Sequence, residues 1–160
     1  MKKTNAMRLL DQAGIKYQAK TYTFSPDDLS GQKAAQALQI PEKQVYKTLM
    51  VNGCQSGYLV CCLSVNRALD LKRIAAISQN KRVELIPASR IQSLTGYVRG
   101  GCSPLAMKKK FPTYIDSEVM NCDQVAVSAG QRGLQILLSP ADLIRAADAV
   151  LADIALKTDD

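Results

Sequence analysis

Lys47 is the first residue with an evident chemical use, because it interrupts an otherwise apolar segment, Val45-Tyr46-Lys47-Thr48-Leu49. If that segment is a strand, Lys47 shares one face with Leu49 and Val51. A lysine on such a face either extends its ammonium group to solvent at the strand end or supplies a point charge in a cleft. In the second case it would bind a phosphate or a carboxylate.

The second motif is Gly100-Gly101-Cys102-Ser103-Pro104. Two glycines allow a positive φ and a close approach of the backbone to a ligand, and the freed N–H groups can form a nest for an oxyanion or a phosphate. A plain tight turn is the alternative. Cys102 is a minor candidate for a nucleophile, because its neighbour Arg99 could lower the thiol pKa.

The third motif is Ser128-Ala129-Gly130-Gln131-Arg132-Gly133. Its G-x-x-G pattern with a basic interior residue is also typical of KH-type RNA-binding loops, which join two helices. Here the flanking segments VAVS and LQILL are strand-like, which favours a hairpin turn instead. The chain has neither G-x-x-x-x-G-K-[ST] nor G-x-G-x-x-G, so nucleotide hydrolysis and dinucleotide binding lack their motifs.

Composition narrows the chemistry further. The 160 residues include no histidine, which excludes Ser-His-Asp and Cys-His catalysis in their usual forms as well as His-ligated metals. The five cysteines are odd in number and none is spaced C-x-x-C, so a zinc ribbon or a redox centre is disfavoured. We expect no metal and no cofactor.

The formal net charge of +7 makes a polyanionic partner plausible. Each basic cluster alone is typical of a solvated face. Aromatic residues are only 5% of the chain, so phosphate contacts are favoured over base stacking. The clusters are Lys2-Lys3, Lys72-Arg73, Lys81-Arg82 and Lys108-Lys109-Lys110.

The amino-terminal stretch MKKTNAMRLLDQAG has no apolar core of a signal peptide, and no apolar run approaches the ~20 residues that span a bilayer. We therefore expect a soluble cytoplasmic protein without a membrane partner. The unpatterned cysteines agree with a reducing compartment.

The elements that must position these motifs alternate irregularly between helix and strand. The runs VYKTLMV and GYLVCCLSV, separated by NGCQS, predict a hairpin, and a further strand is expected before the Gly-rich turn at Gly100. Thr4, Asp70, Ser89 and Ser139 are candidate helix caps, and the stretch AVLADIAL is ambiguous between helix and strand. This pattern predicts an α+β fold with a mostly antiparallel sheet in one domain, residues 1–160.

The motifs occur in a fixed order: Lys-Thr-Leu, Gly-Gly-x-Ser-Pro, Ser-Ala-Gly-x-Arg-Gly, then Ser-Pro-x-Asp-Leu. In this order the chain resembles the YbaK-like family of tRNA-editing proteins, relatives of the editing domain of bacterial prolyl-tRNA synthetases. The resemblance implies a mixed, mostly antiparallel, barrel-like sheet flanked by helices. It also implies hydrolysis of mischarged aminoacyl-tRNA, with Cys-tRNA(Pro) as substrate, and prolyl-tRNA synthetase as a partner.

The same resemblance assigns residues to the chemistry. Lys47 should hold the phosphate or ribose at the acceptor end of the tRNA rather than act as a base. Gly100, Gly101 and Ser103 match the Gly-rich loop that should orient the aminoacyl carbonyl through backbone N–H groups.

Five further residues match positions that should bind the substrate. Ser128 and Gly130 match a second loop lining the pocket, with Arg132 beside it. Asp142 matches a family aspartate, although an acid in the first turn of a helix is also stabilised by the helix dipole. Tyr22 matches an aromatic residue at the pocket mouth.

Some relatives carry a histidine after this tyrosine, where the chain has Ser25-Pro26-Asp27-Asp28, so no histidine role transfers. A cysteinyl ester needs none, because its own thiol can attack the ester carbonyl. Alternative hypotheses are an Ala-tRNA(Pro) deacylase using an activated water, a non-catalytic tRNA- or synthetase-binding module, a basic RNA-binding protein and, last, a cysteine-based redox protein.

Overall fold

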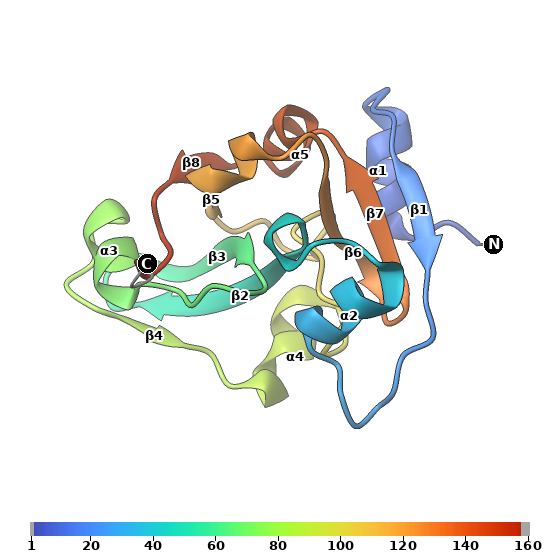
Figure 1. Ribbon diagram of the computed structural model, residues 1–160. Helices are drawn as coiled ribbons and strands as arrows, with labels where there is room; N and C mark the ends of the chain where they lie inside the picture. Colours follow the sequence, from blue (N-terminus) through green and yellow to red (C-terminus); the bar gives the residue numbers. More distant parts are fainter. Residues whose placement is uncertain (1, 158–160) are drawn as a thin grey trace.

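The structure, a computed structural model, describes residues 2–157, which form two β-sheets and five α-helices (Figure 1). The α-helices are α1 Asn5–Gln12, α2 Gly31–Leu38, α3 Leu71–Ile77, α4 Ile91–Thr95 and α5 Pro140–Ala147, and the short 3-10 turns are η1 Glu42–Gln44, η2 Ala88–Arg90 and η3 Ser117–Asn121. The strands are β1 Gln18–Thr21, β2 Tyr46–Gly53, β3 Gly57–Ser64, β4 Val83–Leu85, β5 Thr113–Asp116, β6 Val125–Gln131, β7 Leu134–Leu138 and β8 Val150–Ala152.

The two sheets differ in strand direction. The smaller sheet has the order β1-β7-β6 and is antiparallel throughout. The larger has the order β4-β2-β3-β5-β8, in which the β4-β2-β3 part is antiparallel and the β3-β5-β8 part is parallel. The α+β class with mixed sheets is therefore confirmed.

The expected barrel-like closure is not found in residues 2–157. Within these residues the backbone pairing between the two sheets is a single bridge between Val45 and Ala126, just before β2 begins. The outer strands of the larger sheet, β4 and β8, have three residues each and pair on one side only. Such short edge strands offer too few N–H and C=O groups to join the ends of a sheet.

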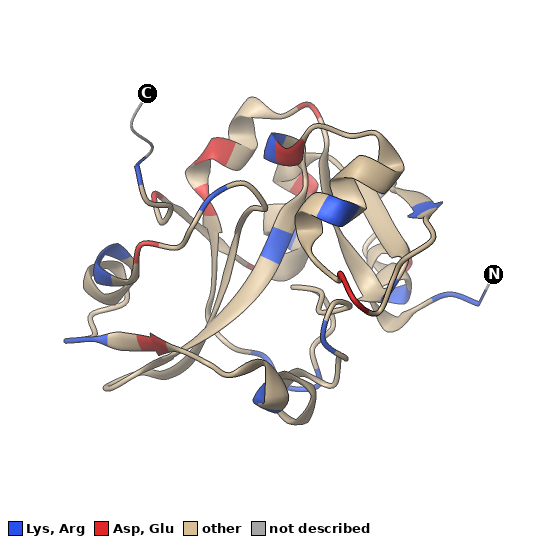
Figure 2. Cartoon of the chain, turned by 60° about the horizontal axis from the view of Figure 1, so that its bottom comes forward, with Lys and Arg blue, Asp and Glu red and all other residues tan. Residues whose placement is uncertain are grey.

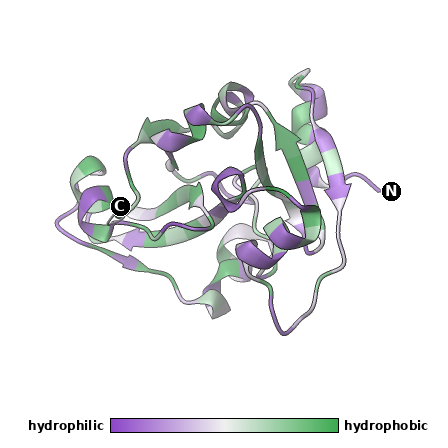
Figure 3. Cartoon of the chain, in the orientation of Figure 1, coloured by the Kyte–Doolittle hydropathy of each residue, from purple (hydrophilic) through white to green (hydrophobic). Residues whose placement is uncertain are grey.

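Both faces of the smaller sheet are covered by helices (Figure 1). Met7 and Leu10 of α1 pack in one cluster with the alternate β7 residues Leu134 and Ile136. On the other face, Ala35 of α2 packs with Ala126 and Leu137, together with Val45. A strand that is buried on both faces is mostly apolar, and four of the five residues of β7 are Leu or Ile, with Gln135 as the exception (Figure 3).

Local capping explains where most helices begin. Thr4, Asp70 and Ser139 each accept a hydrogen bond from the backbone N–H three residues later, as predicted. Ser30 does the same for α2. Ser89 was the wrong choice for α4, since it lies inside η2 and α4 follows that turn directly without a side-chain cap.

The predicted hairpin forms between β2 and β3, with Lys47 paired to Leu63 and Thr48 to Cys62. The ambiguous AVLADIAL stretch contains the short strand β8. The strand expected before Gly100 is absent from the described chain, where α4 leads into an irregular loop over residues 96–112. None of the helices in the described part of the chain is both long enough and apolar enough to cross a membrane.

Candidate active site

A hollow of about 120 Å³ lies where the start of β2, the start of α2, the Gly100 loop and the smaller sheet meet. Four of the predicted site residues line it: Tyr22, Lys47, Gly100 and Ser128. They come from segments up to about a hundred residues apart in sequence. The fold thus joins the three motifs at one place.

Lys47 is held in this hollow by a carbonyl group rather than by an acid. Its Nζ donates a hydrogen bond of 2.5 Å to the backbone oxygen of Arg67 in the turn after β3. Within residues 2–157 no carboxylate lies within 4.0 Å of it. Burial lowers the pKa of the Lys47 ammonium group. Two of its three N–H donors remain for a ligand.

The amino terminus of α2 adds to the positive character of the hollow. Leu29, Ser30 and Gly31 line it, and the first-turn N–H groups of a helix carry partial positive charge. Gly31 packs so closely on Val65 that an added Cβ would lie 2.1 Å from a Val65 methyl carbon. Helix and hairpin are therefore fixed against each other beside Lys47.

The two Gly-containing loops are in direct contact. An added Cβ on Gly101 would lie 3.0 Å from the Gln131 backbone and 3.1 Å from the Arg132 nitrogen. Arg132 Nε also donates a hydrogen bond of 2.8 Å to the carbonyl oxygen of Arg99. Gly100 has φ +84° and faces the side chain of Leu29. Gly101 and Arg132 thus hold the loop that brings Gly100 to the hollow.

A β-bulge shapes the second loop. The register between β6 and β7 shifts between Ser128 and Gln131, and Gly130 lies inside the shift with φ +109°. The N–H of Gly130 donates to Ser128 Oγ at 3.1 Å, which leaves the hydroxyl proton of Ser128 for a ligand. Gly130 itself packs on Tyr97 and does not line the hollow.

Ser103 and Asp142 are not brought into the hollow. Ser103 is fully buried, and its Oγ accepts a hydrogen bond of 3.2 Å from the N–H of Leu105. Asp142 lies in the first turn of α5 and forms an ion pair of 3.0 Å with Arg145. Their contacts stabilise a turn and a helix start, so a direct role for either in binding substrate stays a prediction.

Cys102 lines the hollow without being activated. Burial raises the pKa of its thiol to about 11, so at neutral pH it forms far less thiolate than an ordinary thiol with a pKa of about 8.5. The proposed effect of Arg99 on this thiol finds no support, since the shift is in the opposite direction.

Two parts of the site were not predicted from the sequence. They are the start of α2 and one polar residue, Gln135, which lines the hollow from β7. A usable signal existed for both. Ser30 precedes an Ala-rich amphipathic segment, which is an N-cap pattern. Gln135 interrupts the apolar run LQILL as Lys47 interrupts its own strand.

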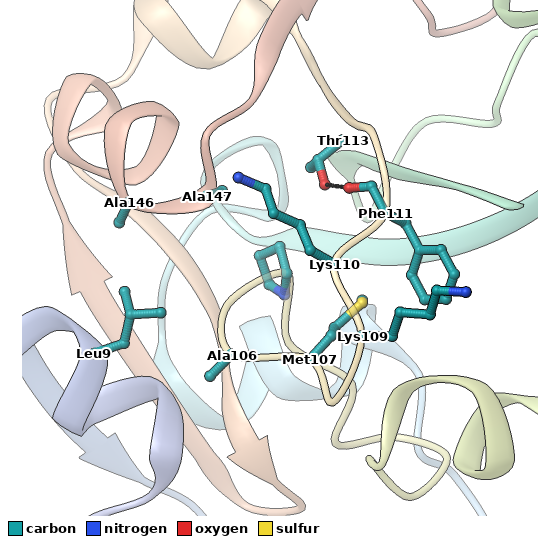
Figure 4. Close-up of a pocket in the computed structure, with 10 residues that line it drawn as sticks. Leu9, Ala106, Met107, Lys109, Lys110, Phe111, Thr113, Ala146 and Ala147 are labelled. Carbon is teal, nitrogen blue, oxygen red and sulfur yellow. Dashed lines mark hydrogen bonds between the residues drawn. The ribbon is translucent and has the colours of Figure 1, made fainter.

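A second hollow of about 210 Å³ lies between α1, α5 and the loop before β5 (Figure 4). Its lining is largely aliphatic, and the nearby Lys110 is paired with Asp148 at 2.5 Å. It contains none of the predicted site residues.

Lys and Arg residues are distributed over many elements of the chain rather than along one stripe (Figure 2).

Comparison with known proteins agrees with this geometry. The sequence profile of the aminoacyl-tRNA editing domain matches residues 26–146. A candidate Cys-tRNA(Pro)/Cys-tRNA(Cys) deacylase of Enterococcus faecalis, EbsC, is 40% identical over 155 residues, which cover 97% of this chain and 94% of the relative.

Solved structures share the fold. A hypothetical protein superposes with a TM-score of 0.87 at 22% identity, over 96% of this chain and 100% of the other. A candidate trans-editing enzyme for prolyl-tRNA synthetase superposes with a TM-score of 0.81 at 21% identity, over 98% and 100% of the two chains. The protein described here belongs to the aminoacyl-tRNA editing domain family.

Proposed function

We propose that the protein is a trans-editing deacylase that hydrolyses mischarged Cys-tRNA(Pro). The observation that carries the proposal is the small hollow in which Lys47, without a carboxylate partner in the described chain, faces the start of α2 and two Gly-containing loops. Family membership and the 40% identical candidate deacylase support the same reaction. The proposal takes residues 1–160 as one editing domain acting in the cytoplasm.

The reaction we propose uses the thiol of the substrate. The cysteinyl thiolate attacks its own ester carbonyl, so that a C–S bond forms and the C–O bond to the ribose breaks. The ribose oxygen takes up a proton, and water then opens the thiolactone to free cysteine. An ordinary thiol pKa of about 8.5 leaves some thiolate at neutral pH, so no strong base is required.

The protein contributes position and charge to this reaction. Lys47 holds the ribose or phosphate at the acceptor end, and its charge favours the oxygen that becomes negative. The backbone of the Gly100 loop and the hydroxyl of Ser128 can orient the carbonyl group. Tyr22, which also lines the hollow, would contact the end of the tRNA.

Deacylation of Cys-tRNA(Pro) and Ala-tRNA(Pro) by the purified protein tests the proposal. We expect rapid release of cysteine and little release of alanine, because alanine has no thiol. Release of alanine at an equal rate would contradict the thiol mechanism. Release of neither amino acid, with tRNA still bound, would instead favour a binding module.

Cys102→Ala is expected to retain deacylation within about twofold, since the thiol has a raised pKa and the proposed reaction uses the thiol of the substrate. Single-turnover release of cysteine is the measurement. A loss of more than about a hundredfold with unchanged thermal unfolding would instead assign the nucleophile to the enzyme.

Selection of the correct tRNA would come from complex formation with prolyl-tRNA synthetase. This proposal is supported by the structural neighbour, which is a candidate trans-editing enzyme for that synthetase. The scattered Lys and Arg residues fit a surface that contacts tRNA phosphates broadly without choosing among tRNAs (Figure 2).

A further inference from the structure

Gln135 is a polar residue of the hollow whose side-chain oxygen has no hydrogen-bond partner in the described chain. It lies on β7, the central strand of the smaller sheet, between Ser128 of β6 and Lys20 of β1. Its side chain lines the hollow, although only 7% of the residue is exposed. Within residues 2–157 its Oε1 is shielded from solvent and has no hydrogen-bond partner.

A buried amide oxygen without a partner is costly, and native proteins rarely keep one without a use. Ser128, its neighbour across the ladder, is already engaged by the N–H of Gly130. The positively charged features of the hollow, the Lys47 ammonium group and the start of α2, are donors. A ligand group that donates a hydrogen bond would therefore satisfy the amide oxygen of Gln135.

We propose that Oε1 of Gln135 accepts a hydrogen bond from the α-amino group of the aminoacyl moiety; this inference rests on the proposed function. A substrate ester places its α-amino group beside the reacting carbonyl. The hollow, at about 120 Å³, has room for a small aminoacyl group. The ribose would bind at Lys47, and the amino acid would reach Gln135 on the buried strand.

The neutral amide suits this role better than a carboxylate would. A carboxylate beside Lys47 would form an ion pair with it and cancel the charge that the reaction uses. An α-amino group with an ordinary pKa of about 8 loses its proton readily in a positively charged site. Gln135 can accept from the resulting neutral amine, and the broad last torsion of a glutamine lets Oε1 turn toward it.

The test compares two substrates and two variants. Cys-tRNA(Pro) carries the α-amino group, and 3-mercaptopropionyl-tRNA(Pro) has the same thiol and ester without it. Gln135→Met keeps the length of the side chain and removes the acceptor. Gln18→Met is the matched control, because it makes the same change at an exposed position of the same sheet.

We expect Gln135→Met to lower kcat/KM for Cys-tRNA(Pro) by about tenfold to a hundredfold and to change that for the mercaptopropionyl substrate by less than about twofold. Gln18→Met should match the unmodified protein on both substrates. Equal losses on both substrates, or no loss on Cys-tRNA(Pro), would overturn the assignment to the α-amino group.

Thermal unfolding separates a binding role from a structural one. Removing an amide oxygen that has no partner should leave the unfolding midpoint of Gln135→Met equal to or above that of the unmodified protein. A clear fall in that midpoint would indicate a structural role and count against the proposal. Inactivity of the unmodified protein on Cys-tRNA(Pro) would overturn the proposed function and this inference together, whereas an active protein insensitive to Gln135→Met overturns the inference alone.

Discussion

Lys47→Ala is expected to reduce the release of cysteine from Cys-tRNA(Pro) by about a hundredfold or more, the usual effect of removing one preorganised donor from a site of developing negative charge. Lys47 is half-buried, and its nearest partner is the carbonyl oxygen of Arg67. Among the described residues, no other lysine or arginine lines the hollow. Single-turnover deacylation with enzyme in excess measures the effect.

The fold should survive this change. The Lys47 ammonium group is partly desolvated and lacks an acid partner in the described chain, so its removal leaves no charged group behind. The unfolding midpoint of Lys47→Ala should therefore stay close to that of the unmodified protein. Lys33→Ala is the matched control, since it removes one exposed positive charge from the neighbouring helix α2 and should retain full activity. A rate for Lys47→Ala within about threefold of the control would exclude Lys47 from the reaction.

Local signals in the sequence were sufficient for much of the fold. Side-chain caps at Thr4, Asp70 and Ser139 and the β2-β3 hairpin depend on a few neighbouring residues, and the structure contains them. The parallel pairing of β3 with β5 depends on residues about fifty positions apart, which no local pattern specifies. The expectation of a barrel-like closure was wrong for a related reason. Closure depends on whether the outer strands of the sheets pair with each other, and no local pattern specifies that pairing.

The sequence allowed some of the residues of the site to be predicted, but not all of the residues that line the hollow. Lys47 stood out because a charged residue in an apolar strand is unusual. Gly100 stood out because a pair of glycines allows a positive φ, and its φ in the structure is +84°. Gln135 gave a similar but weaker signal, because a neutral amide is less conspicuous than a charge. Ser103 and Asp142 came from motif order alone, and motif order does not tell a ligand-facing residue from one that stabilises a turn or a helix.

Gly101→Ala is expected to separate the two loops of the site and to lower deacylation by about tenfold or more, since displacements near 1 Å can cost about a hundredfold in rate. The new Cβ would lie 3.0 Å from backbone atoms of Gln131 and 3.1 Å from the nitrogen of Arg132. Backbone atoms in a tight hairpin cannot move aside as the end of a flexible side chain can. The strain should be relieved by a shift of the loop that also breaks the hydrogen bond from Arg132 to Arg99.

Stability must be measured beside activity, because overpacking by one methyl group typically costs about 1–3 kcal/mol. Gly57→Ala is the appropriate control: Gly57 has φ +82° at the first position of β3, and an added Cβ there would touch nothing within 4 Å. The left-handed conformation alone should cost that variant about 1–2 kcal/mol and leave deacylation unchanged. If the two variants have equal unfolding midpoints, but only Gly101→Ala deacylates the substrate slowly, the defect lies in the contact between the two loops. A normal rate for Gly101→Ala would mean that this contact does not position the reacting groups.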